Sequence, residues 1–129
     1  MSLLRILLVD DNNDFRNTAL KFINSQIRFE SLSWASDGED ALKMIEKFQP
    51  TLILMDSSIV EKNGKETIEI IRKLDRNAII IFLTFDNEIK NQQQLLGNPD
   101  DFISKNEFLQ HLIPTVEKIF GFNVNRNYA

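Results

Sequence analysis

The chain has 129 residues, 43% of them hydrophobic, and its 15 lysines and arginines against 19 aspartates and glutamates leave a net charge of -4. A single domain of this size buries enough apolar surface to fold without disulfide bonds or structural metal ions. The lack of cysteine excludes disulfides, thiolate catalysis and cysteine-type zinc sites. The acidic balance disfavours direct nucleic-acid binding. No run is long enough for a membrane span or a secretory signal, so we expect a cytoplasmic protein without membrane association.

Apolar runs alternate with segments of helical periodicity along the chain, which predicts alternating strands and helices. The expected strands are residues 4–9, 29–35, 52–55, 78–83 and 102–103. The apolar faces of the expected helices begin at Phe15, Leu42, Ile68 and Phe108. Several strands are continuously apolar, as strands are when helices cover both faces of a parallel sheet. We therefore expect an α/β fold with a doubly wound sheet in three layers.

The periodicity is weaker in three places. Residues 88–96 include the polar run "NQQQ", and we expect a fourth helix there that is either short or mobile. Pro114 lies within the last helix and lacks an N–H donor, which predicts a kink or a restart just before it. The end of the chain is polar, and we expect a domain of residues 1–121 followed by a frayed tail or linker stump at residues 122–129.

Polar side chains follow the expected strands at their carboxyl ends, where open parallel sheets bind ligands. They are Asp10, Asp11, Asp56, Thr84 and Lys105. Any one of these aspartates alone is more often a helix cap or turn former. Carboxylates that converge at one edge repel each other unless a cation lies among them, and an all-oxygen cluster favours a hard ion such as Mg²⁺. With a lysine and a hydroxyl, the set is typical of a phosphoryl-transfer site built around one nucleophilic carboxylate.

Sequence segments around these residues match a known family. They are "ILLVDDN" at 6–12, "SDGEDAL" at 36–42, "LILMDSS" at 52–58, the Asn63-Gly64 turn, "IIFLT" at 80–84 and "DDFISK" at 100–105. Together they make the sequence resemble the receiver domain of two-component response regulators over about residues 4–120. The resemblance implies a flavodoxin-like five-stranded sheet with strand order 2-1-3-4-5.

The resemblance also implies roles for the acidic residues. Asp56 would accept a phosphoryl group from the phosphohistidine of a sensor histidine kinase. Asp10 and Asp11 would hold Mg²⁺, with Asp56 and the backbone carbonyl of Ser58 completing the coordination. A protein of this kind catalyses only its own phosphorylation and dephosphorylation, so it is not expected to be an enzyme acting on a separate substrate.

The remaining implied roles concern the response to phosphorylation. Thr84 and Lys105 would contact the phosphoryl oxygens. Phe102 stands where the family carries a switch aromatic, a ring that moves inward when the threonine is drawn toward the phosphate. An equally good interpretation is that Phe102 is an ordinary core residue of the last strand. Downstream, the resemblance implies an effector domain or protein, and a homodimer through the fourth helix, the last strand and the last helix.

The sequence departs from the family pattern at three places. Ile59 and Val60 replace the usual Met-Pro after the phosphoacceptor, which removes a fixed φ and predicts a more mobile loop. Asn106 replaces a cis proline after Lys105, and a cis bond there would cost about 2.5 to 4 kcal/mol, so we predict a trans bond. Phe85 replaces a small residue, and its ring either covers the site and slows access or turns outward.

These departures keep a second hypothesis open: a degenerate receiver that works only as a protein-interaction module, without phosphorylation. A phosphatase of the aspartyl-nucleophile type is disfavoured because Ser58 stands where that chemistry needs a second acid. Nucleotide and flavin binding are disfavoured because the sequence has neither a Walker pattern nor a G-x-G-x-x-G motif. The leading hypothesis is a phosphorylation-dependent signalling switch.

Overall fold

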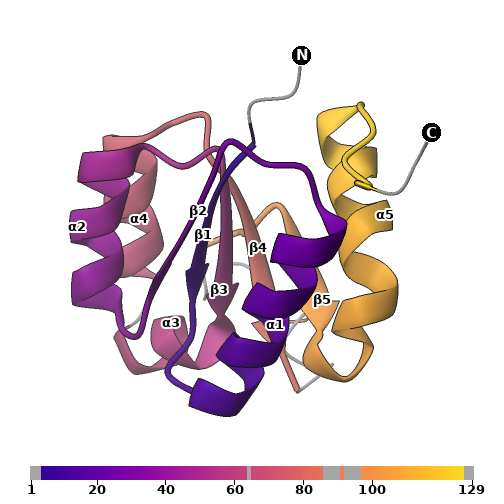
Figure 1. The fold of residues 1–129 in the computed structure, drawn as a ribbon. Helices are drawn as coiled ribbons and strands as arrows, with labels where there is room; N and C mark the ends of the chain where they lie inside the picture. Colours follow the sequence, from indigo (N-terminus) through magenta and orange to yellow (C-terminus); the bar gives the residue numbers. More distant parts are fainter. Residues whose placement is uncertain (1–3, 64, 86–90, 92–96, 127–129) are drawn as a thin grey trace.

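The computed structural model describes residues 4–63, 65–85, 91 and 97–126 (Figure 1). Its parallel strands form one five-stranded sheet in the order β2-β1-β3-β4-β5, which confirms the expected fold class and strand order. The strands are β1 (Arg5–Val9), β2 (Ser31–Ala35), β3 (Leu52–Asp56), β4 (Ile79–Thr84) and β5 (Asp101–Ser104). Each strand lies within two residues of its predicted bounds.

The described helices are α1 (Asn13–Gln26), α2 (Gly38–Phe48), α3 (Ser57–Asn63), α4 (Glu66–Leu74), the 3₁₀ helix η2 (Lys105–Glu107) and α5 (Phe108–Phe120). The four predicted apolar faces lie on α1, α2, α4 and α5, whereas α3 is an element that the periodicity did not predict. The helix expected at residues 88–96 lies outside the described residues, apart from Asn91. Within the described part of the chain, no helix combines the length and apolarity needed to cross a bilayer.

Helices cover both faces of the sheet, which gives the three expected layers (Figure 1). On one face, Leu8 of β1 packs in a buried cluster with side chains of α1 and α5, including Ile23 and Leu112. On the other face, Leu7 packs with side chains of α2, α3 and α4, including Ile45. Because successive strand residues point to opposite faces, strands covered on both sides are apolar throughout. Polar side chains that could form a site are therefore expected at the ends of the strands.

The last helix does not restart at Pro114. α5 is continuous over Phe108–Phe120 with the proline inside it. The missing N–H leaves the carbonyl of Gln110 without its helical donor, but Gln110 is exposed, so water can take that place. Leu112 and Val116 are fully buried on either side of the proline. The restart is therefore absent, because burial of this apolar face outweighs the loss of one hydrogen bond, and the alternative of a kink stays a prediction.

The chain beyond α5 is docked where the structure describes it. Val124 is fully buried, and its backbone N–H donates to Oε2 of Glu117 at 2.9 Å. Its carbonyl accepts from the backbone N–H of Arg28 at 2.8 Å, and Asn125 forms an antiparallel bridge just beyond the end of α1. The expectation of a frayed tail is therefore wrong for this segment, because a buried side chain and backbone hydrogen bonds hold it. Its role as a linker stays a prediction.

Candidate functional site

The polar strand-end residues meet at the carboxyl edge of the sheet, at the bottom of Figure 1. Asp10 directly follows β1, and Asp56 ends β3, the neighbouring strand. Thr84 ends β4 on the other side of β3, and Lys105 follows β5. The parallel register, which pairs Thr84 with Ser104, keeps these strand ends level. The fold thus brings residues from distant parts of the sequence to one edge.

Asp10, Asp11 and Asp56 form a compact acidic cluster. One carboxylate oxygen from each residue lies within 4.8 Å of those of the other two. Asp10 is fully buried and Asp56 is 7% exposed, whereas Asp11 lies on the surface. The convergence predicted from the strand ends is therefore present, and the cluster reaches solvent on the side of Asp11.

Lys105 brings a positive charge into the cluster. Its Nζ lies 2.7 Å from Oδ2 of Asp10 and 3.5 Å from Oδ1 of Asp56, and its side chain is 3% exposed. The ring centroids of Phe15 and Phe85 lie 4.6 Å and 5.2 Å from Nζ. Two carboxylates and two aromatic rings therefore surround the ammonium group.

The two buried carboxylates have different surroundings. Burial raises the pKa of Asp10. Contacts with Lys105 and with the backbone N–H of Asn12 oppose this rise in pKa, and the charge of Asp56 adds to it. Asp56 instead accepts from Ser58, whose Oγ lies 2.6 Å from Oδ2 and whose backbone N lies 3.3 Å from Oδ1. The resemblance gave Ser58 a role as a metal ligand through its carbonyl, but it did not predict this hydroxyl contact, which the turn from β3 into α3 makes possible.

The response regulator receiver domain family matches residues 6–117 of the chain. The chain belongs to this family. It is 30% identical to the chemotaxis protein CheY of Thermotoga maritima over 102 residues, which make up 78% of this chain and 84% of that protein. It is 26% identical to the transcriptional regulatory protein DegU of Brevibacillus brevis over 117 residues, which make up 90% of this chain and 50% of DegU.

Solved structures share the receiver fold. The response regulator domain of CheB from Thermotoga maritima matches with a TM-score of 0.76 at 21% identity, over 95% of this chain and 99% of that one. A two-component response regulator of the LuxR family from Aurantimonas sp. SI85-9A1 matches with a TM-score of 0.79 at 22% identity, over 95% and 89%. The chain spans half of DegU and 22% of two protein-glutamate methylesterases, so it corresponds to one part of those relatives.

The acidic cluster of this receiver domain fits a divalent cation. All three of its members offer carboxylate oxygens, the ligands that Mg²⁺ prefers. Oδ2 of Asp10 is enclosed by protein and, apart from its ion pair with Lys105, has no hydrogen-bond partner among the described residues, so it keeps lone pairs for an ion. Asp10, Asp11 and Asp56 would hold the cation. A contribution from the carbonyl of Ser58 stays a prediction.

The ring of Phe102 is turned into the core of the receiver domain. It is 8% exposed and packs edge-on against Phe82, with ring centroids 5.7 Å apart and planes at 89°. Thr84, at the end of the neighbouring β4, is 3% exposed. In this structure Phe102 is a core residue. The switch role of Phe102 and the phosphoryl contact of Thr84 stay predictions.

The three departures from the receiver pattern have separate structural outcomes. Ile59 and Val60 lie in α3 and are buried, so a helix packed on the core replaces the loop that we expected. The peptide bond between Lys105 and Asn106 is trans, which confirms the prediction. Phe85 is 59% exposed, yet its ring stays beside Nζ of Lys105. The ring therefore faces outward at the rim of the site, and a slowing of access by Phe85 stays a prediction.

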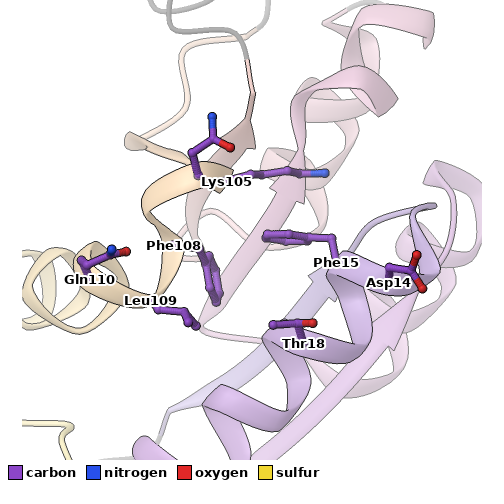
Figure 2. Close-up of a pocket in the computed structure, with 8 residues that line it drawn as sticks. Asp14, Phe15, Thr18, Lys105, Phe108, Leu109 and Gln110 are labelled. Carbon is purple, nitrogen blue, oxygen red and sulfur yellow. The ribbon is translucent and has the colours of Figure 1, made fainter.

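A cleft of about 350 Å³ opens beside the acidic cluster, between α1 and the start of α5 (Figure 2). Its walls include Phe15 and Thr18 from α1 and Phe108 and Leu109 from α5. Figure 2 shows the side chain of Lys105 extended above the ring of Phe15 at one end of this cleft. The cleft thus leads to the buried lysine, although the carboxylates themselves do not line it.

Proposed function

We propose that this receiver domain is a phosphorylation-dependent signalling switch in which Asp56 accepts a phosphoryl group from the phosphohistidine of a sensor histidine kinase. The observation that carries the proposal is the position of Lys105 Nζ, within 3.5 Å of both Asp10 and Asp56 in the acidic cluster. Phosphoryl transfer needs little covalent help, so positioning and charge neutralisation supply most of the acceleration. This site offers a nucleophile, a fixed cation and a place for a divalent ion.

In the proposed reaction, an oxygen of Asp56 forms a bond to phosphorus while the bond between phosphorus and the imidazole nitrogen of the kinase histidine breaks. The imidazole leaves with the electron pair of that bond. Asp10, Asp11 and Asp56 would hold Mg²⁺, which would supply positive charge to the phosphoryl oxygens. Lys105 is close enough to the cluster to contact the same oxygens, and Thr84 offers a hydroxyl from the end of β4.

Phosphorylation would then change the surface that partners recognise. An aspartyl phosphate adds about -1.5 to -2 charges and strong acceptor oxygens, which Thr84 and Lys105 would bind, with Phe102 following the threonine. We propose that the altered surface, formed by the helix expected at residues 88–96 together with β5 and α5, contacts an effector or a second copy in the cytoplasm. The first of these elements lies outside the described residues.

Acetyl phosphate tests the proposal without the cognate kinase. Incubation of the protein with acetyl phosphate and MgCl₂, followed by intact-mass measurement, should show a gain of one phosphoryl group. The gain should be absent in Asp56→Asn and retained in Asp40→Asn, which removes an exposed carboxylate of α2. If the folded wild-type protein gains no mass, the proposal fails and the alternative, an interaction module that works without phosphorylation, replaces it.

A further inference from the structure

Arg16 is a buried cation that does not belong to the acidic cluster. It lies in α1 and is 8% exposed. Its Nη1 donates to the backbone carbonyl of Asp10 at 2.8 Å, and its Nη2 donates to Oδ1 of Asn13 at 2.5 Å. Its Nε is buried without a hydrogen-bond partner among the described residues. Burial of a charged group with an unpaired donor costs free energy, so the position of Arg16 calls for a reason beyond packing.

The ring of Trp34 stacks on the guanidinium group of Arg16. The Cζ atom of Arg16 lies 4.1 Å from the centroid of the Trp34 ring, within the range of a cation–π contact. Trp34 belongs to β2, the edge strand next to β1, and it is 48% exposed. The guanidinium therefore contacts both an edge-strand ring and the turn that carries Asp10. We call this arrangement of Arg16 and Trp34 the arginine clamp.

The arginine clamp acts on the backbone of the most buried member of the acidic cluster. The N–H of Asp10 donates to the carbonyl of Ala35 at 3.1 Å, and its Oδ1 accepts from the N–H of Asn12 at 2.9 Å. The carbonyl oxygen of Asp10 accepts a hydrogen bond from Arg16. Oδ2 is left for the ion pair with Lys105 and for a cation. The orientation of this carboxylate is thus set by contacts on the rest of the residue.

We propose that Arg16 is a positioning residue for the divalent-cation site: the arginine clamp fixes the turn after β1 so that Asp10 and Asp11 present their oxygens together. The inference rests on the proposed function only in requiring that the acidic cluster bind Mg²⁺, and it does not need phosphoryl transfer. Lysine cannot replace the planar guanidinium, because a single ammonium cannot stack on a ring while donating in a fixed fork. Outer contacts that orient metal ligands typically change metal affinity by roughly 10- to 100-fold.

The test measures Mg²⁺ affinity in the absence of any phosphodonor. Urea unfolding in a series of MgCl₂ concentrations at constant ionic strength gives the affinity from the added stability, whatever the starting stability of each variant. Arg16→Lys keeps the charge and loses the clamp, and its affinity should fall about 10-fold or more. Trp34→Ala should weaken binding in the same direction. The double variant should be little worse than Arg16→Lys, because both residues act through one clamp.

Arg72→Lys is the matched control. Arg72 also donates to a backbone carbonyl, that of Ala78 at 2.9 Å, and pairs with Asp100 at 3.2 Å, but these contacts lie before β4 and β5, at the opposite edge of the sheet. This variant should lose stability and keep the wild-type affinity for Mg²⁺. Unchanged affinity in Arg16→Lys overturns the inference and leaves the proposed function standing. Failure of the wild-type protein to bind Mg²⁺ overturns both.

Discussion

Nζ of Lys105 pairs with Oδ2 of Asp10 at 2.7 Å, a shorter contact than the 3.5 Å that separates it from Oδ1 of Asp56. The lysine is therefore the direct counter-ion of Asp10, the most buried carboxylate, and makes a longer contact with Asp56, the proposed phosphoacceptor. A divalent ion bound by Asp10 would neutralise the same carboxylate. The proposed function requires that Lys105 contact a phosphoryl group on Asp56, whose Oδ1 lies 3.5 Å from Nζ.

Removal of this lysine should destabilise the protein in a way that Mg²⁺ corrects. In Lys105→Met, Asp10 loses its partner in a buried pair, so the free energy of unfolding in chelator should fall by about 3 kcal/mol, at the lower end of the cost of breaking such a pair. Saturating MgCl₂ should restore most of the loss. Urea unfolding measures both values. Lys118→Met, which removes an exposed lysine of α5, should change neither, and equal losses with and without Mg²⁺ in Lys105→Met would contradict the argument.

The raised pKa of Asp10 predicts a pH dependence with a definite sign. Between its ordinary value of 3.8 and its higher value in the folded protein, the native state binds more protons than the unfolded chain. The free energy of unfolding attributable to this group therefore falls as pH rises through that window. In chelator, the wild-type protein should lose stability relative to Asp10→Asn as pH rises from 4 toward neutrality, on urea curves measured at each pH. Parallel curves for the two proteins would show that Asp10 is not the group responsible.

The strand ends of the site were predictable because they follow from local patterns. A run such as "LILM" before Asp56 indicates a buried strand, and parallel strands must end at a common edge. The order of the strands came from family resemblance rather than from periodicity. The acidic cluster and Lys105 then followed from the topology, and the structure places them together.

The features that sequence reasoning missed depend on contacts between distant residues. The stacking of Trp34 on Arg16 joins β2 to α1, and the spacing of these two residues in the sequence does not predict this contact. The docking of Val124 likewise depends on Glu117 and on Arg28, which is far away in the sequence. In α3, Ile59 and Val60 are buried against residues of distant elements, which local periodicity does not reveal. Tertiary packing decided each of these outcomes.

Phe85 should limit access of small phosphodonors to the site. Its ring lies beside Nζ of Lys105 and is largely exposed, so Phe85→Ala should open the rim while changing the free energy of unfolding by only about 0.5 kcal/mol. We expect faster labelling by acetyl phosphate, followed by intact mass over time. Phe48→Ala, which truncates another exposed ring at the end of α2, is the control and should label at the wild-type rate. Identical rates for all three proteins would exclude a gating role for Phe85.

The docked segment after α5 should contribute to the stability of the domain, which places part of residues 122–129 inside the folded unit. Val124 is fully buried, and Val124→Ala removes two carbon atoms at about 0.8 kcal/mol each, plus the cost of any cavity, so the free energy of unfolding should fall by about 2 kcal/mol. Glu117→Gln keeps the size of the side chain that accepts from the N–H of Val124 and weakens that hydrogen bond, so it should cost less. Urea unfolding followed by circular dichroism measures both variants. An unchanged midpoint for Val124→Ala would mean that the segment lies on the domain without stabilising it.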